Sequence, residues 1–252
     1  MRVLCCNDDG HTAPGLRVLA DAARAVAEDV WTVGPERKWT AASHHLTFDR
    51  DLVLTRTGER SYACSGTPAD GVIAAMSLLF ADDGPDLVLA GVNDKRNVAE
   101  DIAYSGTMAI AREATFWNVP AIALSGEGWG TRGASEAVTL ARLIDALWGT
   151  RAEWAADGAW LSVNLPDALP APIACARVGR DKIAGACDVV DATGERIVYR
   201  LRRGRPGTRT DGDENALLAQ GSVSVVRFRW QSDVALPPPL VARWQRLIGD
   251  GA

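Results

Sequence analysis

Apolar and polar positions alternate in two different rhythms along the first 165 residues. Residues 2–6 form a short apolar run, whereas residues 15–27 repeat apolar side chains every three or four positions. The first pattern is typical of a buried strand and the second of an amphipathic helix. Strand-like runs recur at 30–33, 52–54, 62–64, 87–90, 121–124 and 160–163, and helical patterns start at 67, 107 and 134. This alternation predicts an α/β fold, a Rossmann-like doubly wound and mainly parallel sheet, with ligands bound beyond the carboxyl ends of its strands.

The pattern changes after residue 165. Pro166, Pro170 and Pro172 interrupt regular structure, residues 173–199 alternate like β-hairpins, and residues 200–209 contain five arginines. We expect a metal- and phosphate-binding core over residues 1–165. The remainder, 166–252, is expected to hold a C-terminal β-hairpin arm, a returning strand at 221–228 and a terminal helix. The arm is too small for a core of its own, so a partner subunit is expected to cover it, with a solvated arm on a monomer as the alternative.

Composition and charge exclude several classes of protein. The net charge is −5, from 27 Lys and Arg against 32 Asp and Glu, which argues against a surface for duplex nucleic acid. The longest nearly apolar run, residues 71–81, is shorter than the ~20 residues that span a bilayer. The 5 cysteines have no Cys-x-x-Cys spacing, which suits a reducing compartment and indicates neither a disulfide framework nor a zinc site. We expect a cytoplasmic protein that binds no membrane.

Acidic and amide side chains follow two of the predicted strands. Asp8 and Asp9 come directly after residues 2–6, and Asn93 follows residues 87–90 at a similar offset. Because parallel strands end at the same edge of a sheet, these side chains are expected to lie close together. Oxygen ligands of this kind suit Mg²⁺, Mn²⁺ or Ca²⁺. An ordinary Asp-Gly turn and a turn asparagine are the alternative interpretation.

A run of small residues precedes the helix predicted at 107–117. Ser105, Gly106 and Thr107 would present free backbone amides and the positive end of a helix dipole to an anion, for which phosphate is the natural candidate. A simple helix N-cap is the alternative role for these residues.

Taken in order, these motifs resemble the stationary-phase survival protein SurE family of metal-dependent 5′/3′-nucleotidases. The resemblance covers most of residues 1–125 and begins with Asn7-Asp8-Asp9-Gly10 and Ala13-Pro14-Gly15. It continues through Gly34-Pro35-Glu36-Arg37, Ala42-Ser43, Leu46-Thr47, Gly66-Thr67-Pro68-Ala69-Asp70, Gly91-Val92-Asn93, Asn97, Asp101 and Tyr104-Ser105-Gly106-Thr107. It returns at Val163-Asn164-Leu165-Pro166, Thr210-Asp211 and Gly221-Ser222-Val223-Ser224. Each motif is short, and their shared order carries the resemblance.

The resemblance implies a metal site and a phosphate site. One divalent cation per subunit, Mg²⁺ or Mn²⁺ with Ca²⁺ as a further candidate, would be held by Asp8, Asp9, Thr40 and Asn93. The family normally has serine in place of Thr40, so the hydroxyl group is kept. The phosphate-binding positions would be Asn97, Ser105, Gly106 and Thr107.

The substrate rim departs from the family pattern at three places. Residues 94–96 replace a small turn that contains Gly and Pro, Thr12 replaces a common histidine, and His44-His45 replace smaller polar residues. The expected rim residues are His44, Lys95 and Arg96.

Lys95 and Arg96 lie between the expected ligands Asn93 and Asn97, so both cations are expected near the substrate. They would favour substrates with a second anionic group, because arginine binds a phosphate or carboxylate through two parallel hydrogen bonds. The alternative is a solvated pair or one bonded to nearby carboxylates, which are Asp94, Glu100 and Asp101.

The implied activity is that of a divalent-metal-dependent phosphomonoesterase that hydrolyses nucleoside monophosphates, a 5′/3′-nucleotidase. Asp8 and Asp9 would be the catalytic residues, with Asp8 orienting a metal-activated water; direct attack by Asp8 to form an aspartyl-phosphate is the alternative. The resemblance also implies a homodimer or homotetramer with exchanged C-terminal segments. The altered rim leaves a second hypothesis open, a catalytically weak regulatory protein that binds metal and phosphate.

Overall fold

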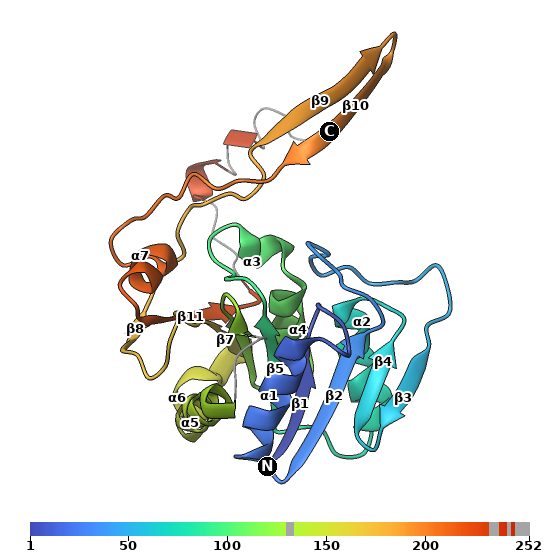
Figure 1. Cartoon of the computed structure of the whole chain (residues 1–252), viewed down its shortest axis with the longest axis vertical. Coiled ribbons are helices and arrows are strands. Elements are labelled where there is room, and N and C mark those ends of the chain that lie inside the picture. The colour runs from blue at the N-terminus through green and yellow to red at the C-terminus, as the bar shows by residue number, and fades with distance from the viewer. Residues whose placement is uncertain (130–133, 232–236, 241–242, 245–252) are drawn as a thin grey trace.

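One mixed sheet contains nine strands in the order β3-β4-β2-β1-β5-β6-β7-β11-β8. A computed structural model describes residues 1–129, 134–231, 237–240 and 243–244 (Figure 1). The strands are β1 (Arg2–Cys6), β2 (Asp29–Pro35), β3 (Leu54–Gly58), β4 (Ser61–Cys64), β5 (Leu87–Asn93), β6 (Ala121–Ser125), β7 (Ala159–Asn164), β8 (Ile173–Cys175) and β11 (Val223–Arg229). The strands from β4 to β7 in this order pair in parallel, whereas β3 and β11 pair antiparallel with β4 and β7.

Helices cover both faces of the sheet. The helices are α1 (Pro14–Arg24), α2 (Pro68–Ala74), α3 (Asp101–Tyr104), α4 (Gly106–Phe116), α5 (Ala134–Gly149), α6 (Arg151–Trp154) and α7 (Glu214–Ala219). Side chains of α1 and α5 pack with Val3 and Cys5 of β1, and side chains of α2 and α4 pack with Leu4 and Cys6. Alternate residues of one strand therefore enter two separate cores, which confirms the doubly wound α/β fold.

The observed bounds agree with the hydrophobic pattern at α2 and differ from it at β3. Thr67 and Asp70 form the expected capping box of α2, with the Asp70 amide 3.1 Å from the Thr67 hydroxyl oxygen. The strand expected at 52–54 instead begins at Leu54 and ends at Gly58. β3 is an edge strand with exposed residues after Leu54, so burial leaves no alternating apolar pattern there.

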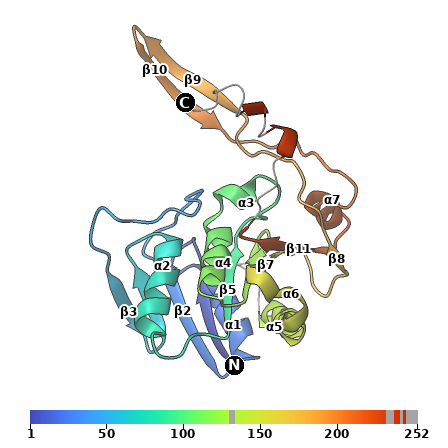
Figure 2. The ribbon, with the colours of Figure 1, turned by 180° about the vertical axis from the view of Figure 1, so that it is seen from behind.

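The C-terminal segment divides into a returning part and a projecting part. β11 and β8 extend the core sheet beyond β7, so the sheet continues past residue 165. β9 (Ala186–Thr193) and β10 (Arg196–Arg202) form the expected hairpin, which projects away from the sheet in both views (Figure 1 and Figure 2). The expected terminal helix falls largely outside the described residues. Among the described helices, none has the length and apolarity needed to cross a bilayer.

Candidate functional site

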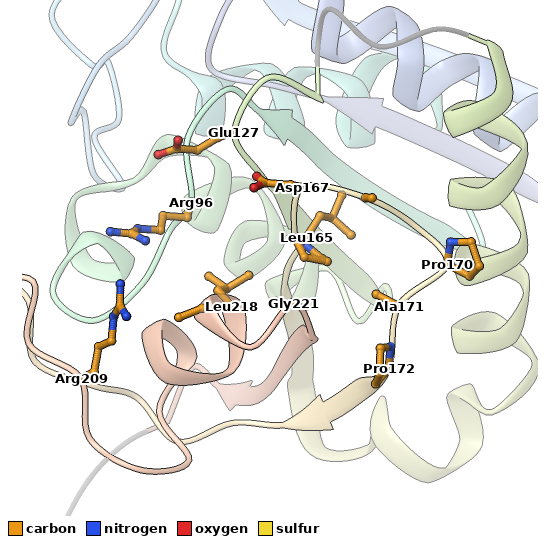
Figure 3. A pocket seen from close by; sticks show the side chains of 13 residues that line it. Arg96, Glu127, Leu165, Asp167, Pro170, Ala171, Pro172, Arg209, Leu218 and Gly221 are labelled. Carbon is orange, nitrogen blue, oxygen red and sulfur yellow. The ribbon is translucent and has the colours of Figure 1, made fainter.

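Two neighbouring cavities lie at the carboxyl edge of the sheet. The smaller, about 300 Å³ and here called the Asp8 cavity, is lined by all the residues expected to hold a metal: Asp8, Asp9, Thr40 and Asn93. The larger, about 560 Å³ and here called the Arg209 cavity, lies beyond the ends of β6 and β7 (Figure 3). Arg96 lines both cavities and therefore stands at their boundary.

Asp8 is buried and bonded to two other segments. The Thr107 hydroxyl donates to Asp8 Oδ1 over 2.7 Å, and the Trp39 amide donates to the Asp8 carbonyl over 2.8 Å. Burial raises the pKa of Asp8 to about 6; the Thr107 bond opposes this rise, and the neighbouring Asp9 charge adds to it. Burial thus destabilises the charged form of Asp8, and a bound cation would stabilise that form.

The remaining donors also suit a hard cation. Asp9 forms an ion pair with Lys38, so this carboxylate already attracts positive charge. The Asn93 side-chain amide donates to the Lys95 carbonyl over 2.7 Å, which leaves its oxygen as an acceptor. Within the described residues, no three His, Cys, Asp or Glu side chains gather as a metal site. The expected set instead combines two carboxylates with a hydroxyl and an amide oxygen, all donor types that Mg²⁺, Mn²⁺ and Ca²⁺ accept.

Ser105, Gly106 and Thr107 have three different places in the structure. Ser105 lines the Asp8 cavity and caps α4, because its hydroxyl accepts a hydrogen bond from the Met108 amide over 3.2 Å. Gly106 packs so closely on Asp8 that a Cβ there would lie 2.8 Å from the Asp8 Cβ. The Thr107 side chain is fully buried on Asp8. Gly106 and Thr107 are buried, and of these three residues only Ser105 lines the Asp8 cavity.

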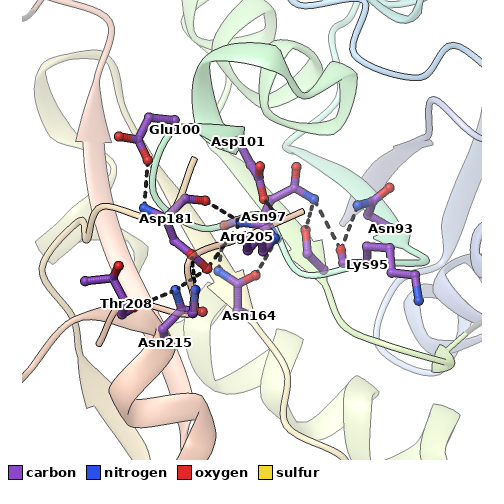
Figure 4. Close-up of polar contacts among 12 residues, drawn as sticks. Asn93, Lys95, Asn97, Glu100, Asp101, Asn164, Asp181, Arg205, Thr208 and Asn215 are labelled. Atoms are coloured by element: carbon purple, nitrogen blue, oxygen red, sulfur yellow. Dashed lines mark hydrogen bonds and ion pairs between the residues drawn. The ribbon is translucent and has the colours of Figure 1, made fainter. Parts of the chain in front are cut away.

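Asn97 lines the Asp8 cavity and is held by the ends of two strands. Its backbone amide donates to Asn164 Oδ1 over 2.8 Å, and Asn164 Nδ2 donates back to the Asn97 carbonyl over 2.9 Å (Figure 4). The Asn97 side chain donates to the Ser125 hydroxyl over 3.1 Å. β7 and β6 thus determine the position of the loop that carries Asn97.

The start and end of the hairpin arm also reach the Asp8 cavity. We call residues 180–183 and 203–209 the arm base. Arg203 and Arg205, from its second part, line the cavity. Arg205 forms an ion pair with Asp101 and donates to the Asp181 carbonyl over 2.9 Å (Figure 4). The arm therefore contributes positive charge to a site otherwise built by the core.

Asp181 is the buried centre of the arm base. Its side chain is 0% exposed and accepts hydrogen bonds from the Gly207 amide over 2.9 Å and from Asn215 Nδ2 over 3.0 Å. The Asp181 amide donates to Glu100 over 2.8 Å, and this bond, with help from Arg180, lowers the pKa of Glu100. The arm base is thereby fastened to the loop that carries Asn97 and α3.

The three expected rim residues do not lie together. Lys95 and Arg96 line the Asp8 cavity. Within the described residues, His44 is absent from the lining of both cavities. Its Nε2 lies 2.8 Å from the Glu113 carboxylate, and its ring stacks on Phe116 with centroids 5.6 Å apart. Because Glu113 is a buried residue of α4, this contact holds the His44 ring against α4 and away from the cavity.

Several residues of this site were missing from the sequence prediction. Asn164 had a usable signal, because it is the last residue of β7 as Asn93 is the last residue of β5, and both strands end at the same edge. Lys38 lies in an irregular loop whose path the sequence does not indicate. Arg205 is one of the arginines between residues 200 and 209, and nothing in the local pattern separates it from the others.

Comparisons with known proteins agree with the motifs. Residues 3–185 match the family model described as survival protein SurE. A protein named 5′-nucleotidase SurE from Rhodopseudomonas palustris (strain BisA53) is 50% identical over 127 residues, which is 50% of each chain. The chain thus aligns with only about half the length of that relative. A second 5′-nucleotidase SurE, from Paramagnetospirillum magneticum, is 37% identical over 229 residues, covering 82% of this chain and 84% of the relative.

A solved structure extends the similarity to nearly the whole fold. The crystal structure of the SurE protein from Aquifex aeolicus superposes with a TM-score of 0.77 at 26% sequence identity. The match covers 99% of this chain and 100% of that chain. The core sheet and the C-terminal segment therefore share one architecture with that protein.

Proposed function

Because the chain belongs to the survival protein SurE family, we propose that it is a divalent-metal-dependent phosphomonoesterase that hydrolyses nucleoside monophosphates. The relatives named 5′-nucleotidase support the nucleotidase class. The observation that carries the proposal is the convergence of Asp8, Asp9, Thr40 and Asn93 on one cavity, which Ser105 at the start of α4 also lines. This combination suits a metal ion and a phosphate group bound side by side.

We assign metal binding and orientation of the attacking water to separate groups of the site. Asp8, Asp9, Thr40 and Asn93 would hold the cation, which when bound polarises the phosphoryl group and lowers the pKa of a water. Thr107 holds one oxygen of Asp8, which leaves the second oxygen to orient the attacking water.

Phosphate binding and charge stabilisation would come from the surrounding loops. The Gly106 and Thr107 amides, together with Asn97, would bind the phosphoryl oxygens. Lys95 and Arg203 line the same cavity and would stabilise the negative charge of the transferring group. In this arrangement both the core and the arm base contact the substrate.

Phosphate release from a panel of nucleoside monophosphates tests the proposal. Turnover is expected with Mg²⁺ or Mn²⁺ and should disappear with EDTA. If no member of the panel is turned over with either metal, the chain is instead the metal- and phosphate-binding regulatory protein.

A rapid acid quench during a single turnover distinguishes the two nucleophiles. With a ³²P-labelled monophosphate, attack by water leaves no radioactivity on the protein. Labelled protein that is lost in an Asp8→Asn variant would instead indicate an aspartyl-phosphate.

The arm supports a proposal about assembly. Val189, Ile197, Tyr199 and Leu201 of the hairpin are each at least 60% exposed. Apolar side chains in a projecting hairpin are typical of a surface that a second subunit covers. We infer a homodimer or homotetramer in which partners cover each other's C-terminal segments.

A further inference from the structure

The Arg209 cavity is larger than the Asp8 cavity and adjoins it. Arg96 enters it from the loop after β5, and Arg209 enters it from the arm base (Figure 3). Leu165, Pro172 and Leu218 supply apolar wall. The cavity is therefore a space between the core and the C-terminal segment, with one cationic residue from each.

The two arginines share one side of the cavity and have no partner. Figure 3 shows the Arg96 and Arg209 side chains on the same side of the cavity, with the end of Arg209 directed toward that of Arg96. In the described part of the chain, neither guanidinium forms an ion pair or a side-chain hydrogen bond. Of the three carboxylates expected as partners of Arg96, Glu100 pairs with Arg180 and Asp101 with Arg205. Within the described residues, the third, Asp94, forms no ion pair with Arg96.

Two carboxylates, those of Glu127 and Asp167, also line the Arg209 cavity, and each takes part in an interaction of its own. Arg96 is half-buried and Arg209 is exposed. An anion bound between the two guanidinium groups would reduce the repulsion between their like charges.

We propose that Arg96 and Arg209 bind a second anionic group of the substrate, a phosphate or a carboxylate. The guanidinium fork suits both groups because it donates two parallel hydrogen bonds to a pair of oxygens. Since Arg96 lines both cavities, a ligand whose reacting phosphate occupies the Asp8 cavity can place its second anion in the Arg209 cavity. This inference rests on the proposed phosphomonoesterase function and specifies its substrate class.

The site takes one residue from the core and one from the C-terminal segment. Arg96 lies in the loop after β5. Arg209 comes from the arm base, so the site forms only when the arm base is docked on the core. Substrate selection and arm docking are coupled through this one cavity.

Paired substrates and paired variants test the inference. The probes are adenosine 5′-monophosphate and adenosine 3′,5′-bisphosphate, and the variants are Arg96→Gln and Arg209→Gln. Arg200→Gln is the matched control, because it removes the same charge from the exposed hairpin. The wild-type kcat/KM is expected to be about tenfold higher for the bisphosphate, as charge-assisted hydrogen bonds predict. Each cavity variant should remove most of that preference through KM, whereas the control should keep it.

The outcomes separate this inference from the proposed function. If adenosine 5′-monophosphate is hydrolysed and the bisphosphate preference is the same in the wild type and both cavity variants, the inference is wrong and the function stands. If neither of these nucleotides nor any member of the monophosphate panel is hydrolysed, the function is wrong, and calorimetric titration with the bisphosphate decides the site. Weaker binding in both cavity variants but not in Arg200→Gln would then support an anion site, and equal binding in all proteins would overturn it.

Discussion

The Asp8 cavity has a core half and an arm half, and the two are built differently. In the core half, Asp8 and Asn93 stand at the ends of buried parallel strands, and the neutral residues Thr107 and Gly106 restrain the most buried ligand, Asp8. In the arm half, ion pairs and hydrogen bonds hold Arg205 against Asp101 and Asp181. The core half supplies donors for a cation and a phosphate, and the arm half supplies positive charge.

Arginine–aspartate ion pairs occur in both a buried and an exposed part of the arm. Arg205 in the arm base and Arg202 in the hairpin both pair with aspartates. The Asp181 side chain in the base is fully buried, whereas that of Asp188 in the hairpin is 46% exposed. Because solvent screens the exposed pair, only the pairs of the base are expected to stabilise the site. Four variants sharpen this contrast.

The largest effect is expected from Asp9→Asn, in the core half. The amide keeps the shape of the side chain but removes a charged ligand, so metal affinity should fall and activity should drop by about 100-fold or more. The fold should remain intact, because Asp9 contacts the exposed Lys38 rather than the buried core. Calorimetric titration with Mn²⁺, with Asp21→Asn as a surface control, measures the effect. Unchanged metal affinity would exclude Asp9 as a ligand.

The next largest effect is expected from Asp181→Asn, in the arm base. Loss of this buried carboxylate leaves Arg205 partly unpaired and should cost about 3 kcal/mol of unfolding free energy. The value of kcat/KM should fall as well, because Arg205, which lines the Asp8 cavity, loses one of its two carboxylate partners. Asp188→Asn, which breaks a pair on the exposed hairpin, is the matched control. Thermal unfolding measures the stability of both variants, and steady-state kinetics measures kcat/KM. Equal changes in the two variants would contradict the contrast between the arm base and the hairpin.

A smaller effect on activity, but a direct one on assembly, is expected from changes in the hairpin. Val189 and Tyr199 are cross-strand neighbours and are both exposed. Replacing both by serine should weaken association by removing apolar contact area, while Asp191→Asn serves as a polar control in the same hairpin. Light scattering at micromolar concentration should show an oligomer for the wild type and a lower mass for the double variant. A monomeric wild type would rule out the partner subunit.

The smallest effect is expected from Glu214→Gln, at the start of α7. Glu214 accepts a hydrogen bond from the Gly179 amide over 2.6 Å, and burial raises its pKa. The folded state therefore binds this proton more tightly than the unfolded state, so wild-type stability declines as pH rises above the ordinary Glu value of about 4.3. The uncharged variant lacks this decline. The melting temperature of the variant minus that of the wild type should therefore rise by a few degrees as the pH increases from 4 to 7. A difference that does not change with pH would contradict the assignment.

The sequence by itself determined the layered core and the acidic end of the site. Strand and helix periodicities are local consequences of burial, so they identified the parallel sheet and the edge at which Asp8, Asp9 and Asn93 gather. The same logic failed for β3, because an exposed edge strand has no buried face to leave a pattern.

Only the tertiary structure decided which polar side chains act together. Thr107 was expected at the phosphate, and packing of α4 turned its hydroxyl to Asp8. His44 was expected at the rim, and the buried Glu113 holds it elsewhere. Arg205 and Arg209 occur in the same short run as Arg202, yet the first two line cavities and the third pairs on the exposed hairpin. Identical side chains acquire different roles because their partners come from distant segments, and the folded chain alone brings those segments into contact.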